Sequence, residues 1–231
     1  MPGTLRIAPS ILSADLTALA DAVAAVERGG ADLIHVDVMD GHFVPALTFG
    51  APIVEALVRV ATVPIDVHLM VSEPERHLET FAEAGAAMIS VHVEVSPHLH
   101  RTLTAIKSLG VKAGAVVNPS TSVNLLKEVA GELDFVLVMS VNPGYAGQTF
   151  ITQSESKVRA ARDLLDRAGN IAPVEIDGGI QPSNASRLVR AGAEILVAAS
   201  SIFRTDDPAE ATRRLREAAL NDSNVVMPHK S

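Results

Sequence analysis

One local pattern of small and apolar residues occurs three times along the chain. In each copy a short Gly/Ala turn leads directly into an apolar run. The three copies are Gly29-Gly30-Ala31 before LIHVDV, Ala84-Gly85-Ala86 before MISVHV, and Ala191-Gly192-Ala193 before ILVAAS. A glycine that ends a helix just before a buried strand produces this pattern. The intervals between the turns are about two and about four copies of a unit of roughly 27 residues, which indicates a repeated helix–strand architecture.

Further β-branched runs, each bounded by turn-forming residues, complete a set of predicted strands. The predicted ranges are 5–10, 32–38, 64–69, 87–93, 112–117, 134–140, 173–177 and 194–199. A chain of 231 residues holds about eight such units. We therefore predict an α/β protein, a (β/α)8 TIM barrel that forms a single domain over residues 1–231. Residues from about 221 to 231 show no pattern, and we expect them to form a flexible tail.

Two segments between the predicted strands show the spacing of amphipathic helices. The first apolar stripe consists of Leu16, Leu19, Ala20, Val23 and Val26, and the second of Val158, Ala161, Leu165 and Ala168. Ser154 precedes the second stripe and is predicted to cap that helix through its hydroxyl.

Composition supports a buried parallel sheet and excludes several kinds of chemistry. Hydrophobic residues make up 48% of the chain but aromatic ones only 3%, so aliphatic side chains must fill the core. The net charge of −8, without a basic stripe, argues against nucleic acid as a partner. The absence of cysteine excludes disulfides and thiolate metal sites. Because no signal segment or long apolar run is present, we expect a cytoplasmic protein without membrane association.

Ionisable side chains gather where the predicted strands end, which is where barrels of this kind place their active sites. His35 and Asp37 end the second strand, His68 ends the third and Asp177 ends the seventh. Such groups are costly inside a narrow barrel unless they pair with each other or bind a metal ion. Two imidazoles and two carboxylates suit one divalent ion such as Zn, Fe, Mn or Co. A buried His/Asp salt-bridge network is the alternative, but four such groups at the catalytic end favour the metal. Among the neighbouring polar residues, Asp66 is expected to orient His68, whereas His92 and Glu94 are candidates for supporting roles.

The separation of two of these carboxylates suggests a reaction. Asp37 and Asp177 lie on well-separated strands, so each can face a different side of a bound molecule. Inversion of a carbon next to a carbonyl requires one base to remove a proton and an acid to return one from behind. The resulting enediolate carries negative charge that a divalent cation can stabilise. The thioethers of Met39, Met70 and Met139 could shield it, although ordinary core packing explains each of them equally well.

Three loops rich in small residues follow the sixth, seventh and eighth predicted strands. They are the segments 142–148, with the sequence NPGYAGQ, Gly178-Gly179, and Ala199-Ser200-Ser201. Backbone N–H groups of such loops can converge on an anion, and a short helix beginning near Ser200 would add its dipole. Barrels often hold a phosphate group near the seventh and eighth strands. The loops therefore predict a phosphorylated small-molecule substrate.

At these positions the sequence closely resembles the ribulose-phosphate 3-epimerase family. The matching segments are APSILSAD (8–15), HVDVMDGHFVP (35–45), DVHLMV (66–71), VMSVNPGYAGQTF (138–150), EIDGGI (175–180) and AASSIF (198–203). They cover nearly the whole predicted barrel in the same order. The sequence differs from the family's usual pattern at Ala46, Ala146 and Ala199, where asparagine, glycine and glycine are common.

The resemblance implies the interconversion of D-ribulose 5-phosphate and D-xylulose 5-phosphate in the pentose phosphate pathway. It implies metal ligation by His35, Asp37, His68 and Asp177, with Asp37 and Asp177 as the acid/base pair. The substrate contacts that it implies are Ser10, His68, Gly144, Tyr145, Ala146, Gly147, Asp177, Gly178, Gly179, Ala199 and Ser200. Family members are commonly oligomeric, so we expect a homo-oligomer.

Two alternatives remain open at this stage. A 3-epimerase of a ketohexose 6-phosphate, such as allulose 6-phosphate, would use the same residues. A non-catalytic phosphosugar-binding barrel would need the phosphate loops but not the two opposed carboxylates. A Schiff-base aldolase is disfavoured, because none of the five lysines stands at the end of a predicted strand.

Overall fold

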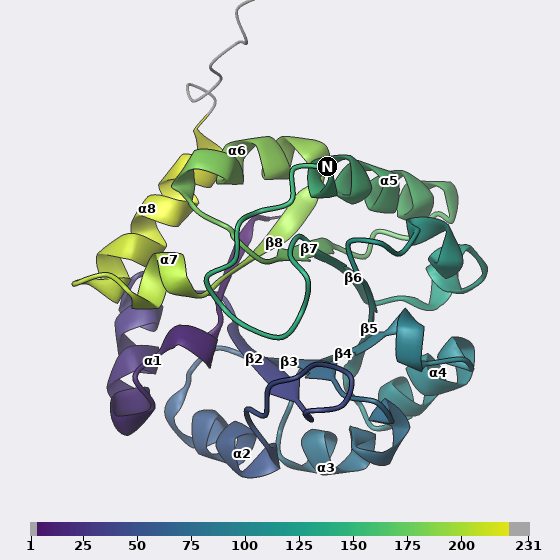
Figure 1. The fold of residues 1–231 in the computed structure, drawn as a ribbon, viewed down its shortest axis with the longest axis horizontal. Coiled ribbons are helices and arrows are strands. Elements are labelled where there is room, and N and C mark those ends of the chain that lie inside the picture. Colours follow the sequence, from purple (N-terminus) through teal and green to yellow (C-terminus); the bar gives the residue numbers. More distant parts are fainter. Residues whose placement is uncertain (1–3, 222–231) are drawn as a thin grey trace, which may run out of the picture.

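Eight parallel strands form one sheet that closes into a ring surrounded by helices (Figure 1). The structure, a computed structural model, describes residues 4–221. The strands are β1 (Arg6–Pro9), β2 (Ile34–Met39), β3 (Ile65–Met70), β4 (Met88–His92), β5 (Lys112–Val117), β6 (Phe135–Met139), β7 (Val174–Asp177) and β8 (Ala193–Ala198). Their order is β1-β8-β7-β6-β5-β4-β3-β2, and a parallel bridge between Ser10 and His35 joins the two ends. The predicted barrel is therefore confirmed, and every predicted strand overlaps an observed one to within two residues at each end.

Helices cover the outside of the ring. They are α1 (Leu19–Arg28), α2 (Ala51–Val60), α3 (Leu78–Glu83), α4 (Leu99–Ser108), α5 (Ser154–Arg167), α6 (Pro182–Ala191), α7 (Ser200–Phe203) and α8 (Pro208–Leu220). Short 3-10 helices are η1 (Ile11–Ser13), η2 (Leu16–Ala18), η3 (Pro74–Arg76), η4 (Val93–Val95) and η5 (Val123–Glu132). Between residues 4 and 221, no helix has both the length and the apolar character that a membrane crossing needs.

The repeated Gly/Ala turns have the conformation that the sequence predicts. Gly30, Gly85 and Gly192 all have positive φ, at 90°, 98° and 111°, and each lies between a helix and the next strand. A side chain at Gly192 would also meet the Arg162 side chain at 2.9 Å. Glycine is needed here because L-residues with a Cβ rarely adopt this left-handed conformation.

Three expectations about local structure need correction or fall outside the described residues. Leu16 does not belong to the buried stripe, because it lies in η2 and is 56% exposed. Ser154 does not cap α5: Gln153 occupies the N-cap, and the buried Ser154 hydroxyl instead donates to the carbonyl of Met139 at 3.5 Å. Of the tail expected over about 221–231, residues 222–231 lie outside the described part of the chain.

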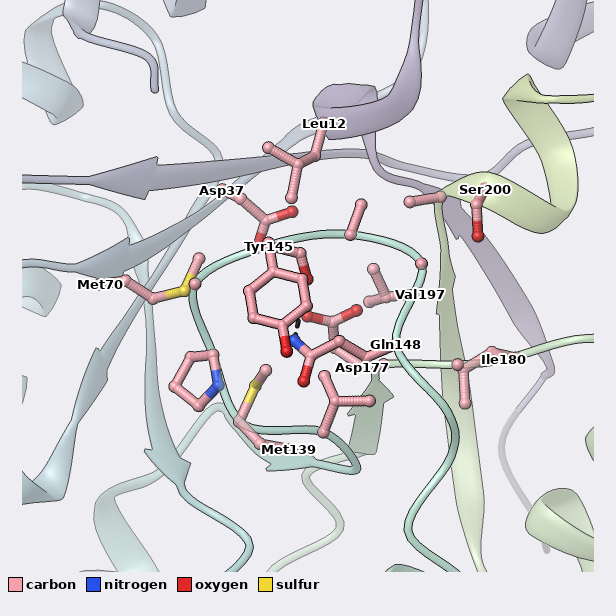
Figure 2. A pocket seen from close by; sticks show the side chains of 18 of the residues that line it. Leu12, Asp37, Met70, Met139, Tyr145, Gln148, Asp177, Ile180, Val197 and Ser200 are labelled. Carbon is pink, nitrogen blue, oxygen red and sulfur yellow. Dashed lines mark hydrogen bonds between the residues drawn. The ribbon is translucent and has the colours of Figure 1, made fainter. Parts of the chain in front are cut away.

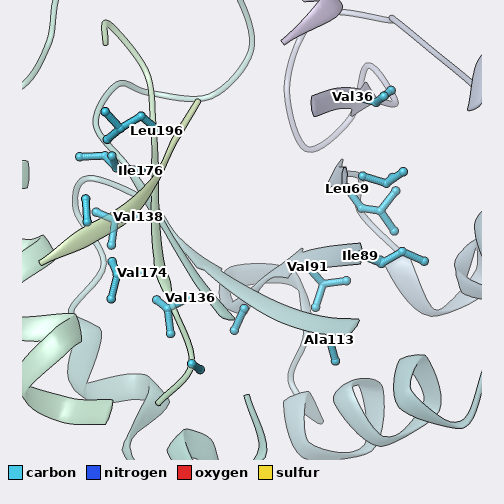
Figure 3. Packing of buried hydrophobic residues seen from close by; sticks show 14 of the residues in the cluster. Val36, Leu69, Ile89, Val91, Ala113, Val136, Val138, Val174, Ile176 and Leu196 are labelled. Atoms are coloured by element: carbon cyan, nitrogen blue, oxygen red, sulfur yellow. The ribbon is translucent and has the colours of Figure 1, made fainter. Parts of the chain in front are cut away.

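The main hydrophobic layer lies between the strands and the surrounding helices (Figure 3). Alternate residues of each strand point outward into it, including Val36, Leu69, Val91, Val138 and Ile176. The residues between them point into the barrel, because side chains alternate along a strand. This alternation gives the helices their apolar partners and leaves the inward positions free for the site.

The inside of the barrel is apolar at one end and polar towards the other. One apolar cluster inside the barrel contains Ala8, Leu33, Met88, Phe135, Ile195 and Val197, and it extends from the first residues of β4 and β6 to Val197 at the cavity. Phe135 fills much of this space and is fully buried. It lies beside Gly114 on the neighbouring strand, where an added Cβ would meet the Phe135 ring at 2.3 Å.

Gly114→Ala is expected to lower the free energy of unfolding by about 1–3 kcal/mol, because the buried ring has to move away from the new methyl group. Urea unfolding would measure the loss. Gly131→Ala is the control, since the exposed Gly131 has no atom within 4 Å of an added Cβ. Equal stabilities of the two variants would contradict this account of the barrel interior.

Candidate active site

Strands β2, β3 and β7 bring together the four residues that the sequence predicts as metal ligands, and only Asp177 is the last residue of its strand. One ligand atom from each of His35, Asp37, His68 and Asp177 lies within 4.8 Å of all the others. Strand register explains part of this arrangement, because Asp37 on β2 is directly paired with His68 on β3. A register shift at Val174/Glu175 in the pairing of β7 with β8 brings Asp177 opposite Val197, whose side chain faces the cavity.

Each of the two histidines turns a different ring nitrogen towards Asp37. The Nδ1 atom of His35 is 2.7 Å from Asp66, so its Nε2 faces the cluster, 3.4 Å from Asp37. In His68 the Nε2 atom is 2.8 Å from Nε2 of His92, so Nδ1 faces the cluster, 3.2 Å from Asp37. Asp66 thus orients His35 rather than His68, because it pairs with His35 across the β2–β3 ladder. The sequence analysis expected Asp66 to orient His68, and this prediction was wrong.

The donor set fits a divalent cation. Nε2 of His35 is fully buried and has no hydrogen-bond partner among the described residues. Two imidazole nitrogens and two carboxylate oxygens within 4.8 Å of one another are typical ligands of a transition metal. The Asp66 carboxylate behind His35 matches the outer partner that metal-bound histidines usually have.

The two carboxylates of this cluster differ in proton affinity. Burial and the negative charge of Asp37 raise the pKa of Asp177 to about 7. Burial also acts to raise the pKa of Asp37, but His35 and His68 overcome it and hold the pKa well below its usual range. The Ser10 hydroxyl donates to the second oxygen of Asp37 at 2.6 Å, and Ser10 also pairs with His35 where the barrel closes.

A second buried acidic residue, Glu175, lies behind His35 and was absent from the predicted site. Its Oε1 is 3.5 Å from Nδ1 of His35, and neither of its oxygens has a hydrogen-bond partner among the described residues. Burial and the neighbouring Asp66 raise the pKa of Glu175 well above its usual value. Glu175, Asp66 and His35 form a second group with metal-ligand spacing. Its position in the sequence could have identified it, because Glu175 stands two residues before Asp177 and therefore on the same face of β7.

The loop that follows β6 crosses the barrel mouth (Figure 1). A cavity there is lined by this loop together with Asp37 and Asp177 of the cluster. Figure 2 shows Asp37 and Asp177 reaching this cavity from different strands, with the Tyr145 ring in front of Asp177. The predicted residues that line it are Asp37, Met39, Met70, Met139, Gly144, Tyr145, Ala146, Gly147, Asp177, Gly178, Gly179, Ala199 and Ser200. Pro143 and Gln148, which belong to the predicted loop 142–148, also line it, and the lining residues outside the predictions are Leu12, Val141, Ile180 and Val197. His35, His68 and Ser10 are buried and do not line the cavity.

The loops around the cavity are held in place by specific contacts. The Gln148 side-chain amide donates to the carbonyls of Asn142 at 2.6 Å and Tyr145 at 2.9 Å. The buried Ser140 hydroxyl lies within hydrogen-bond distance of the carbonyls of Asp177 and Gly178, at 2.8 and 2.6 Å. Gly178 has a φ of 117° and leaves no room for a Cβ, which would approach Val141 to 2.5 Å. The predicted short helix near Ser200 is observed as α7.

Alanine is compatible with the backbone at both loop positions where the sequence differs from the usual glycine. No residue other than glycine has a positive φ in the described chain, so neither Ala146 nor Ala199 adopts a conformation that requires glycine. Both residues line the cavity, and alanine has the same backbone N–H group as glycine. The two differences therefore leave the donors of the loops intact.

A closed parallel barrel with two buried histidines and two aspartates gathered beneath glycine-rich loops is typical of (β/α)8-barrel enzymes. The family model described as "Ribulose-phosphate 3 epimerase family" matches residues 6–203. The chain therefore belongs to the ribulose-phosphate 3-epimerase family and is an isomerase that acts as an epimerase.

Similar proteins from several organisms support this assignment. A ribulose-phosphate 3-epimerase from Bacillus subtilis (strain 168) is 48% identical over 213 residues, which cover 92% of this chain and 98% of the relative. One from Synechocystis sp. (strain ATCC 27184 / PCC 6803 / Kazusa) is 49% identical over 220 residues, covering 94% and 96%. The chloroplastic ribulose-5-phosphate-3-epimerase of Arabidopsis thaliana is 47% identical over 212 residues, covering 91% and 75%.

Solved structures support the fold alone. A 3-hexulose-6-phosphate synthase superposes with a TM-score of 0.70 at 18% identity and covers 93% of this chain and 99% of its own. At this identity the similarity carries no information about the reaction.

Proposed function

We propose that the protein interconverts D-ribulose 5-phosphate and D-xylulose 5-phosphate by inverting C3, as an enzyme of the pentose phosphate pathway. The observation that carries the proposal is the placement of Asp37 and Asp177 in one cavity, with ligand oxygens within 4.8 Å of each other. They come from β2 and β7, which β1 and β8 separate around the ring. Two such groups can exchange protons with opposite faces of a planar substrate carbon held between them.

In the proposed reaction, one of these aspartates removes the proton from C3 and the other returns a proton from the opposite side. In one direction the Asp37 carboxylate takes the proton and a protonated Asp177 gives one, so the substrate gains and loses one proton overall. In the reverse direction the two roles are exchanged. Ser10 holds one oxygen of Asp37 through the 2.6 Å hydrogen bond, which leaves the other free to face the cluster.

One divalent ion, held by His35, Asp37, His68 and Asp177, belongs to this proposal. It would supply electrostatic stabilisation for negative charge that develops on the substrate oxygens. The structure favours no particular ion among Zn, Fe, Mn and Co. The thioethers of Met39, Met70 and Met139 line the same cavity and would keep water from the reacting carbon.

The phosphate group is proposed to bind at the side of the cavity formed by residues 144–147, 178–179 and 199–200. These segments converge there with small residues, which let a ligand approach the backbone closely. Homo-oligomer formation and cytoplasmic location stay predictions.

Solvent exchange provides the test of the reaction and of the substrate. When D-ribulose 5-phosphate is incubated with the protein in deuterated water, NMR is expected to show deuterium at C3 together with formation of D-xylulose 5-phosphate. The value of kcat/KM for this pentose phosphate is expected to exceed that for allulose 6-phosphate. A preference for the hexose phosphate would replace the proposed substrate, and the absence of any exchange would refute the proposed reaction.

A further inference from the structure

A chain of four side chains runs from the proposed cation site to the surface of the barrel mouth. Asp37 contacts Nδ1 of His68 at 3.2 Å, Nε2 of His68 contacts Nε2 of His92 at 2.8 Å, and Nδ1 of His92 contacts Glu94 at 3.2 Å. Both imidazole rings are fully buried, and they stack with centroids 5.0 Å apart. The proposed reaction uses Asp37 and His68 but assigns nothing to His92 or Glu94.

Glu94 is held so that it can only accept a hydrogen bond from His92. Its Oε1 already accepts from the backbone N–H of Asn118 at 2.9 Å and from the Thr121 hydroxyl. Lys157 fixes the loop that carries these donors, through bonds to three of its backbone carbonyls. Although burial opposes ionisation, His92, Thr121 and Asn118 lower the pKa of Glu94 to about 2. The remaining oxygen therefore requires a hydrogen on Nδ1 of His92.

The number of hydrogens in this chain then decides which nitrogen of His68 is free. Two neutral imidazoles carry two N–H hydrogens. The chain has three contacts that could each hold a hydrogen: Asp37 with His68, His68 with His92, and His92 with Glu94. Because Glu94 requires Nδ1–H on His92, Nε2 of His92 is an acceptor and His68 must donate from its own Nε2. The contact between Nδ1 of His68 and Asp37 therefore has no hydrogen. A nitrogen lone pair then faces a carboxylate there, an arrangement that a bound cation would satisfy on both sides.

We propose that Glu94 and His92 are positioning residues that set the tautomer of His68, so that its Nδ1 is free to ligate the cation. This proposal rests on the proposed metal site. His35 reaches the same result with the opposite nitrogen, because Asp66 holds its Nδ1 and leaves Nε2 free. Outer partners of this kind orient and tune metal-bound histidines, and their loss typically weakens metal binding about 10–100-fold.

Glu94→Gln is the decisive variant, because it keeps the shape of the side chain and reverses the chain of hydrogens. The amide oxygen has to take the place of Oε1, where Asn118 and Thr121 donate, so the NH2 group faces His92. His92 must then accept at Nδ1 and carry its hydrogen on Nε2. His68 must in turn accept at Nε2 and carry its hydrogen on Nδ1, which blocks the nitrogen that faces the cluster.

NMR of protein labelled with 15N-histidine and titration with Zn²⁺ together test the proposal. In the zinc-loaded wild type we expect hydrogens on Nε2 of His68 and Nδ1 of His92. Glu94→Gln is expected to bind Zn²⁺ about 10–100-fold more weakly in a chelator competition, with an unchanged circular dichroism spectrum. Glu55→Gln, which removes an exposed acid of α2, should bind like the wild type.

Each outcome separates this proposal from the one it rests on. If the wild type binds Zn²⁺ and Glu94→Gln binds it equally tightly, the positioning role is refuted while the metal site stands. A zinc-loaded wild type with hydrogen on Nε2 of His92 would refute the positioning role as well. If the wild type takes up none of Zn²⁺, Fe²⁺, Mn²⁺ and Co²⁺, the metal site itself is wrong and the role of Glu94 fails with it.

Discussion

Asp177→Asn is expected to lower kcat at least about a hundredfold while the barrel stays folded, because an amide cannot give or take the proton at C3. Its size is almost unchanged, so the neighbouring strands and the loop held by Ser140 should keep their packing. Coupled assays of ketose phosphate turnover would measure the loss. Asp163→Asn on the exposed side of α5 is the matched control and should have wild-type activity.

A stereochemical measurement makes this prediction sharper. If Asp37 and Asp177 serve opposite sides of C3, Asp177→Asn should still exchange the C3 hydrogen of one epimer with deuterated water, without converting it. Asp37→Asn should exchange only the other epimer. Metal content has to be measured alongside, since both residues are proposed ligands. Near-normal turnover by Asp177→Asn, or identical exchange by the two variants, would contradict the two-base mechanism.

Complete removal of metal is expected to abolish activity, and addition of one equivalent of a single divalent ion is expected to restore it. The physical reason is that two carboxylates and two imidazoles converge in a buried cluster within 4.8 Å, where Nε2 of His35 has no hydrogen-bond partner among the described residues. Exhaustive chelation, followed by separate addition of Zn²⁺, Fe²⁺, Mn²⁺ and Co²⁺, would also identify the most effective ion. Circular dichroism before and after chelation controls for unfolding. Metal-free protein that works at full speed would show that these residues form only a buried polar network.

The barrel was predictable because its signals are local. The Gly/Ala turns before three strands reflect a backbone conformation that few other residues adopt, as the φ of 111° at Gly192 shows. The alternation along β2, with Val36 outward and His35 and Asp37 inward, is also written in consecutive residues. Ser154 was misjudged because a tertiary contact overrides its capping preference, and Leu16 because a local 3-10 turn interrupts the helical spacing. Ser154 faces the carbonyl of Met139, and Leu16 is in a 3-10 turn outside the helix.

The sequence by itself thus determined the strands, the barrel and the candidate ligands, since periodicity and strand ends depend on neighbours along the chain. Only the tertiary structure decided which groups meet across strands: Asp66 with His35 rather than His68, Glu175 behind both, and His92 between His68 and Glu94. These pairings depend on strand register and on which ring nitrogen faces which neighbour. Neither quantity is encoded in the spacing of residues along one strand, because both are fixed when the sheet closes and every buried donor must find an acceptor.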